Sequence, residues 1–321
     1  MSNVDVQKNL IIEIDNELLN VLLKDRSSHK HIIWATNDYA HRGKRYDVDK
    51  QITVASITGR NGYLIKPRTE KDQKEQLHRI RDKAEVFTPS WICNRQNNLI
   101  DNAWFGQVGV FNTEDDKGWT VTTDKIIFPT VDGKTWQDYV KDVRLEVSCG
   151  EAPYLASRYD TVTGNPIAVK DRIGLLDRKL RVVSENTDDE QTWYAWAKEA
   201  FKSIYGFDWQ GDNVLLAREN LLFTFVDNFV KKFGTTAKKE YLLEIAEILS
   251  WNIWQMDGLK FVIPNSCKTT PKRHSALCDE GSTECEGCKK GDNSKHIGSY
   301  CKIKDWETDR TVKFVSLVNK K

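Results

Sequence analysis

Residues 145–155 read Leu-Glu-Val-Ser-Cys-Gly-Glu-Ala-Pro-Tyr-Leu, and this stretch decides the fold that the sequence predicts. The apolar–polar–apolar residues 145–147 predict a short strand, and Ser148, Cys149 and Gly150 follow it as a tight turn. In a Rossmann-like sheet, small residues in the turn after the first strand let a ligand approach the backbone. An acidic residue after the next strand accepts hydrogen bonds from ribose hydroxyls. The stretch therefore predicts a nucleotide-type cofactor at a strand end.

Working outward from this turn, the pattern from residue 84 to about 265 is α/β. Apolar residues recur at helical spacing in three long segments, which predict helices over 192–206, 212–233 and 238–251. Short strands are expected at 126–128 and in several places between 31 and 67, including 52–54. The charged run 68–83 predicts a solvated helix.

The turn at 148–150 resembles the Asp-Pro-x-Cys-Gly-x-Gly-x-Phe-Leu motif of adenine-N6 DNA methyltransferases from type I and type IIG restriction–modification systems. The matching positions are Cys149, Gly150, Tyr154 and Leu155. Glu146 stands where the family has Asp, and Ala152 stands where it has a second glycine. The resemblance covers about residues 84–263 and implies that Glu146, Cys149 and Gly150 contact S-adenosylmethionine.

Three further segments follow the order of the same family's motifs. Residues 85–89, Glu-Val-Phe-Thr-Pro, resemble the segment whose aromatic ring and Thr-Pro bend wall the cofactor pocket, which implies a role for Phe87 and Thr88. Asp208 matches the acid that binds the ribose hydroxyls, and Asp257 the acid that reads the adenine amino group. Each has a simpler alternative: Phe87 as core, Thr88 as a helix cap, Asp208 as a cap or surface carboxylate, and Asp257 as a turn residue.

The catalytic Asn/Asp-Pro-Pro-Tyr/Phe tetrapeptide of that family is missing. None of the seven prolines is adjacent to another, so the catalytic residues are unknown. In the family this tetrapeptide holds the target amine of a base flipped from DNA. We expect the cofactor-binding modification subunit of a DNA adenine-N6 methyltransferase, with a second protein chain supplying the catalytic motif and target recognition. The alternatives are transfer through a non-standard loop and a catalytically inactive DNA- or protein-binding module.

Cysteines cluster near the C-terminus, with Cys285 and Cys288 in a Cys-x-x-Cys spacing. Zinc favours four thiolate or imidazole ligands in a tetrahedron. The predicted ligands of a structural zinc ion are Cys267, Cys285, Cys288 and Cys301, because Cys267 and Cys301 flank the insert where it leaves and rejoins the core. Cys278 or His296 is an alternative for one of them.

Bulk composition limits the remaining classes. Charged residues make up 30% of the chain and the net charge is +1, so any DNA contact must use a local patch or a partner. The apolar runs are too short to span a membrane, and no basic segment followed by an apolar one predicts a secretory signal. The cysteine pattern is more typical of a metal site in a reducing cytoplasm than of secreted disulfides.

The predicted organisation is a Rossmann-like S-adenosylmethionine-dependent methyltransferase domain of the α/β class with additions at both ends. We expect an N-terminal α/β extension over 1–75, the cofactor-binding domain over 76–265, a cysteine-rich zinc knuckle over 266–302 and a C-terminal strand over 303–321.

Overall fold

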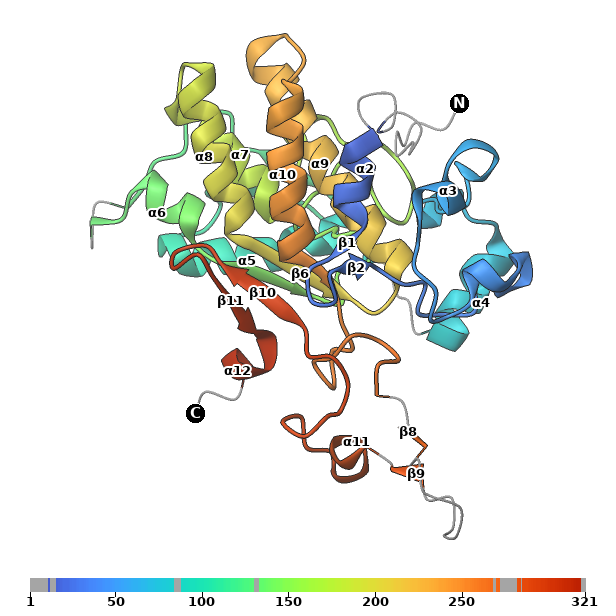
Figure 1. The fold of residues 1–321 in the computed structure, drawn as a ribbon. Helices are drawn as coiled ribbons and strands as arrows, with labels where there is room; N and C mark the ends of the chain where they lie inside the picture. Colours follow the sequence, from blue (N-terminus) through green and yellow to red (C-terminus); the bar gives the residue numbers. More distant parts are fainter. Residues whose placement is uncertain are drawn as a thin grey trace, which may run out of the picture.

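The computed structural model describes residue 11 and the ranges 16–83, 88–129, 133–267, 270–271, 282–283 and 285–318. Within these ranges the protein is a mixed α/β structure (Figure 1). It contains one three-stranded sheet and four two-stranded sheets. No helix in the described ranges is long and apolar enough to cross a membrane.

The three-stranded sheet is parallel and has the order β5-β6-β7. Its strands are β5 (Arg144–Val147), β6 (Ile204–Asp208) and β7 (Ile253–Gln255). The strand predicted at 145–147 is therefore confirmed as β5. Leu145 lies opposite Tyr205, and Phe207 lies opposite Trp254, so residues on one face of the sheet align across all three strands.

Long helices make both crossovers between these strands. They are α7 (Leu175–Asn186) and α8 (Glu190–Lys202) before β6, then α9 (Gly211–Phe233) and α10 (Lys239–Asn252) before β7. The last two confirm their predicted helices, and α9 ends at Gly234 with φ 70°, a left-handed cap that glycine adopts at low cost. The helix predicted over 192–206 ends early, at Lys202. Residues from Ile204 onward instead hydrogen-bond to the neighbouring strands.

The two faces of the sheet meet different layers. Ile204 and Ile253 belong to the core that is shared with the long helices, which Figure 1 shows together on one face. Phe207 and Trp254 point to the opposite face and pack against Phe314, at centroid distances of 5.9 and 5.3 Å. On that second face β5 is uncovered: Leu145 is 44% exposed and Val147 is 63% exposed.

The N-terminal residues pack on the outside of the helical layer. Helix α2 (Asn16–Leu23) lies against α10 and α9, and the hairpin of β1 (Lys24–Asp25) and β2 (Lys30–His31) follows it. The buried Arg218 of α9 donates hydrogen bonds to the carbonyls of Leu22, Lys24, Ser250 and Ile253. One side chain thereby joins the N-terminal region to the end of α10 and the start of the sheet.

Two predicted strands are wrong. Residues 126–128 are not in regular secondary structure, and Val54–Ile57 form the short helix α3 where residues 52–54 were expected to be a strand. The Ser56 hydroxyl accepts the Thr53 backbone N–H at 3.0 Å in a capping box, and this local bond favours a helix start over extended backbone. The charged run does contain the predicted helix, α4 (Gln73–Lys83).

The remaining helices and strands are short, except for the helix Ser90–Phe105. Between α4 and β5 come α5 (Ser90–Phe105), β3 (Asn112–Glu114), β4 (Trp119–Val121) and α6 (Trp136–Lys141). After β7 come β8 (Thr270–Pro271), β9 (Ser282–Thr283), α11 (Glu286–Lys290), β10 (Lys302–Asp305), β11 (Arg310–Lys313) and α12 (Phe314–Val318). Residues 303–321, expected as one strand, hold the β10–β11 hairpin and α12 within their described part.

Candidate functional site

The turn after β5 has an unusual backbone. Ser148, Gly150 and Ala152 have φ values of 51°, 52° and 61°, which lie in the left-handed region. Residues other than glycine rarely adopt this region, and they persist there where the surroundings hold them. Ala152 thus has a backbone conformation for which glycine is better suited.

The carboxylate of Asp208 contacts this turn. Its Oδ2 atom accepts a hydrogen bond from the Gly150 N–H at 3.0 Å, and its Oδ1 atom accepts from the Gln210 N–H at 2.9 Å. Because β5 and β6 are parallel neighbours, their carboxyl ends meet at one edge of the sheet. Two predicted cofactor residues, Gly150 and Asp208, are thus brought into direct contact.

Glu146 is buried beneath the same turn. Its two oxygens accept from the N–H groups of Tyr154 and Leu155, at 3.4 and 3.3 Å. Burial raises the pKa of the Glu146 carboxyl to about 8, although these two N–H groups act in the opposite direction. Cys149 is also buried, and burial raises the pKa of its thiol well above the usual value. A thiol held neutral in this way is suited to packing.

The segment before α5 reaches this turn from the other side. Thr88 interacts through its side chain with Tyr154, and Asn97 of α5 donates to the Tyr154 carbonyl at 3.0 Å. Thr88 does not cap α5, which begins at Ser90. At the start of α5, the Ser90 N–H donates instead to the Asp160 carboxylate at 2.8 Å. Phe87 lies outside the described residues.

Asp257 closes a turn just after β7. Its Oδ1 atom accepts from the N–H groups of Leu259 and Lys260, at 3.0 and 3.1 Å. This is the geometry of a turn residue. The turn is joined to β6 through Met256, whose N–H donates to the Asp208 carbonyl at 2.9 Å. The three predicted stretches therefore lie at consecutive strand ends of one sheet.

Gln255, which the sequence did not single out, organises the end of β7. Its amide exchanges two hydrogen bonds with the backbone of Ile33, at 2.9 and 2.8 Å, and donates a third to the Trp209 carbonyl. Gly211 completes this contact, because a Cβ there would lie 2.0 Å from the Ile33 carbonyl oxygen. An N-terminal segment thus crosses the sheet edge beside β7.

Asn220 of α9 contacts the turn after β5. Its side-chain amide donates to the carbonyls of Glu151 and Ala156, at 3.0 and 3.4 Å. Glu151 is fully buried, and its carboxylate accepts from the Arg68 N–H and the Tyr159 hydroxyl. Asn220 therefore holds the backbone of the candidate cofactor turn at Glu151, and Arg68 and Tyr159 hold the Glu151 side chain.

Four side chains converge within the C-terminal cysteine-rich segment. They are Cys267, Cys285, Cys288 and His296, whose ligand atoms all lie within 4.8 Å of one another. The Nδ1 atom of His296 lies 3.7, 3.5 and 3.6 Å from the three sulfur atoms, in that order. Zinc bonds of about 2.3 Å to sulfur and about 2.0 Å to nitrogen give tetrahedral S···N edges of about 3.5 Å. The group therefore has the spacing that suits a metal ion such as zinc.

The surroundings favour the thiolate form of Cys285, whereas burial raises the pKa of the Cys267 thiol to about 11. The Ile297 N–H donates to the Cys285 sulfur at 3.4 Å. Burial opposes ionisation of Cys285, but this N–H, the Cys288 backbone and His296 outweigh it and lower the pKa of the thiol to about 6. Thiolate is the form that binds metal. Gly287 leaves the room that the site needs, because a Cβ there would lie 2.7 Å from the His296 Nδ1 atom.

Cys301 is not part of this group, which corrects one predicted ligand. It is fully buried in the core beneath the sheet, and its thiol donates to the Gln255 carbonyl at 3.3 Å. His296, the alternative that the sequence left open, takes the fourth position. Cys278, the other alternative, lies outside the described residues.

Two sizeable cavities lie away from the sheet end. One, of about 700 Å³, lies between the β3–β4 hairpin, α7 and α9, and the other, of about 600 Å³, is lined by residues from 38 to 79. No predicted cofactor residue lines either cavity. Comparison with known proteins adds no assignment, because no family model, curated protein or solved structure matches this chain.

Proposed function

We propose that this chain binds S-adenosylmethionine at the carboxyl end of the β5–β6–β7 sheet and acts as the cofactor-binding subunit of a DNA adenine-N6 methyltransferase. The observation that carries the proposal is the contact between the Asp208 carboxylate and the Gly150 N–H, at 3.0 Å. A glycine turn beside an acid on the adjacent parallel strand is the arrangement that binds an adenosyl group in Rossmann-like sheets.

Four of the predicted residues have a task in this proposal. Asp208 accepts hydrogen bonds from the ribose hydroxyls, and the turn at Gly150 provides the close backbone approach. Glu146 holds the loop at Tyr154 and Leu155 in position, and its buried carboxyl stays away from the ligand. Thr88 supports the same loop through Tyr154.

A second chain supplies the catalytic residues in this proposal, since the sequence has no Pro-Pro pair. The place we assign to it is the outer edge of β5, with which no strand pairs within the described ranges. Leu145 and Val147 in that strand are 44% and 63% exposed, and Val143 just before it is 65% exposed. Parallel strands are normally covered on both faces, and an apolar, unpaired edge strand is a site for another strand to add.

The metal group has a structural task in the proposal. Four protein ligands complete a tetrahedron and leave no position for substrate, which is typical of structural zinc. The ion would fold a short polar segment that has little apolar surface of its own to bury. Its ligands come from positions 267, 285, 288 and 296, so it links the start of the insert with the residues that precede β10.

Calorimetric titration with S-adenosylmethionine tests the proposal. We expect the wild-type chain to bind and both Asp208→Asn and Phe87→Ala to bind at least about tenfold more weakly. For Asp208→Asn the reason is a lost charge-assisted hydrogen bond, which costs about 1.5 kcal/mol or more. For Phe87→Ala the reason is the lost packing of an aromatic ring against the ligand. Asp188→Asn, at an exposed residue outside the motifs, serves as the matched control. Circular dichroism and bound zinc verify that each variant is folded.

A catalytically inactive DNA- or protein-binding module is the second candidate. The observation that favours it is that the carboxylates of Glu146, Asp208 and Asp257 all accept backbone N–H groups, so each stabilises the fold without a ligand. If the folded, zinc-loaded chain binds no cofactor, this second candidate replaces the first.

A further inference from the structure

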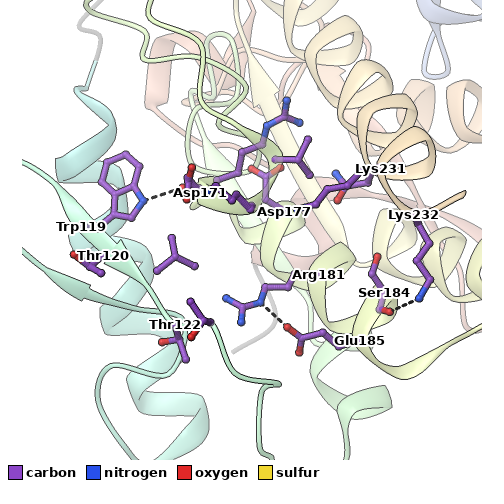
Figure 2. A pocket seen from close by; sticks show the side chains of 16 residues that line it. Trp119, Thr120, Thr122, Asp171, Asp177, Arg181, Ser184, Glu185, Lys231 and Lys232 are labelled. Atoms are coloured by element: carbon purple, nitrogen blue, oxygen red, sulfur yellow. Dashed lines mark hydrogen bonds and ion pairs between the residues drawn. The ribbon is translucent and has the colours of Figure 1, made fainter. Parts of the chain in front are cut away.

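The cavity of about 700 Å³ beside α7 and α9 has the features of a separate binding site. It is lined by residues of β4, of the 3-10 helix η6 (Val169–Asp171), of α7 and of α9. Figure 2 shows Trp119 and Thr122 on the side of the hairpin, with Lys231 and Lys232 on the side of α9. Its volume falls within the range of about 300–1,000 Å³ that is usual for small-molecule sites.

Basic side chains outnumber acidic ones around this cavity, by five to three. Lys170 and Lys231 form no ion pair within the described part of the chain, and Lys232 donates to the Ser184 carbonyl, which leaves its charge uncompensated. Burial lowers the pKa of Lys231, and the neighbouring charges of Arg172, Arg181 and Lys170 add to that effect. Such a concentration of positive charge favours an anion.

Arg172 gives an independent sign of a missing partner. Its side chain is only 6% exposed; two of its nitrogen atoms are bonded, to Asp227 and to the Ile167 carbonyl. Its third nitrogen, Nη1, is buried and has no hydrogen-bond partner within the described residues. An orphaned guanidinium N–H costs free energy unless an acceptor fills the position, and phosphate oxygens are acceptors that guanidinium groups prefer.

The acidic residues of the lining are largely engaged elsewhere. Glu185 pairs with Arg181 at 2.6 Å and accepts the Ile126 N–H. Asp177 accepts from the N–H groups of Ser157 and Gly174 through its Oδ2 atom, but its buried Oδ1 atom has no hydrogen-bond partner within the described residues, so this acid also offsets part of the positive charge. Asp171 is the acid that acts on Lys231, and it partly offsets the positive charge. An anion therefore meets a net attraction from Lys170, Lys231, Lys232 and Arg172.

The hairpin side of the cavity contributes an aromatic surface. The indole N–H of Trp119 donates to the Asp171 carbonyl at 2.8 Å, which fixes the ring at the wall of the cavity. Val121 and Val169 are the apolar neighbours in the lining, and Thr120 and Thr122 add hydroxyl groups. A planar ring against Trp119 and an anionic group against the lysines would fill the cavity together.

We propose that this cavity binds a nucleoside phosphate, with its base beside Trp119 and its phosphate between Arg172, Lys231 and Lys232. This site shares no lining residue with the sheet end at Gly150 and Asp208, so it does not depend on the function proposed above. A ligand here would bridge the β3–β4 hairpin, α7 and α9, and it would satisfy the Arg172 Nη1 atom.

Isothermal titration with ADP tests the inference, with adenosine and inorganic phosphate as partial ligands. We expect ADP to bind more tightly than either, and Lys231→Ala and Trp119→Leu each to weaken it about tenfold. Lys44→Ala, at an exposed lysine remote from the cavity, should change ADP affinity less than about twofold.

Three results would overturn the inference: no ADP binding at millimolar concentration, ADP binding that neither Lys231→Ala nor Trp119→Leu weakens, or adenosine binding as tightly as ADP. S-adenosylmethionine should not displace ADP, because the two proposed sites have no residue in common. Displacement by S-adenosylmethionine would mean that the two ligands compete for one site, and it is a fourth result that would refute two separate sites. Retained unfolding cooperativity in both variants separates lost binding from lost folding.

Discussion

The ion pair between Arg79 and Asp212 offers a prediction whose size follows from the structure. Both side chains are 1% exposed; the Arg79 Nη2 atom lies 2.5 Å from the Asp212 Oδ2 atom, and the Tyr39 hydroxyl donates to the same oxygen at 2.9 Å. Burial opposes the charge of Asp212, but Arg79 and Lys71 outweigh it and lower its pKa from 3.8 to about 2. At about 1.36 kcal/mol per pKa unit, the charged form contributes about 2 kcal/mol of stability.

Asp212→Asn should therefore lower the free energy of unfolding by about 2–4 kcal/mol at pH 7. The upper figure arises because the buried Arg79 would keep only the more distant carboxylates of Asp38 and Glu75, at 3.7 and 3.9 Å. The sign with pH follows from a depressed carboxyl pKa: the contribution is complete above about pH 4 and is lost as the pH falls towards 2. The difference between wild type and variant should shrink over that interval.

Urea unfolding at pH 7, 4 and 3 measures this difference. Glu244→Gln is the matched control, because Glu244 pairs with Lys198 at 2.9 Å but is 54% exposed, and a surface pair is worth less than about 1 kcal/mol. A loss below about 1 kcal/mol for Asp212→Asn at pH 7, or a loss that stays constant from pH 7 to 3, would refute the reasoning.

Three further predictions concern the metal group, the turn and the open strand. The purified chain should carry about one zinc ion, measured by atomic absorption after dialysis. The His296→Ala variant should lose this ion and the Cys301→Ser variant should retain it. The opposite pattern would restore Cys301 as the ligand. Because burial raises the pKa of Glu146 to about 8, its folded carboxyl is neutral near pH 7, and wild-type stability should fall as the pH rises from about 5 to 8. Glu146→Gln should reduce that fall in urea unfolding, and an identical pH response of both proteins would contradict the assignment. Val147→Ser should lower the free energy of unfolding of the isolated chain by less than about 1 kcal/mol, because the Val147 side chain is 63% exposed. Trp193→Ala in the core should lower it by about 4 kcal/mol. Equal losses of stability in thermal unfolding would mean that β5 is covered.

Local sequence signals predicted the elements that local physics determines. The helices at 212–233 and 238–251 follow from apolar residues at helical spacing. The structure adds that α9 is buried on all sides from residue 211 to residue 225, which the apolar spacing did not predict. The apolar–polar–apolar pattern at 145–147 predicted the strand, and Gly150 indicated the turn that follows it. The strand predicted at 52–54 was wrong because a hydrogen bond between Thr53 and Ser56 competes with β-propensity, and the apolar pattern does not contain that bond.

The sequence by itself determined the α/β alternation, the glycine turn at Gly150 and the Cys-x-x-Cys half of the metal group, because each depends on residues a few positions apart. Tertiary structure alone decided which residues meet across long separations. It placed His296 beside Cys285 and buried Cys301 under the sheet, and it paired Arg79 with Asp212. The physical reason is that packing fixes these contacts after the chain has folded back on itself, and a side chain's distant partner leaves no periodic signal in the sequence.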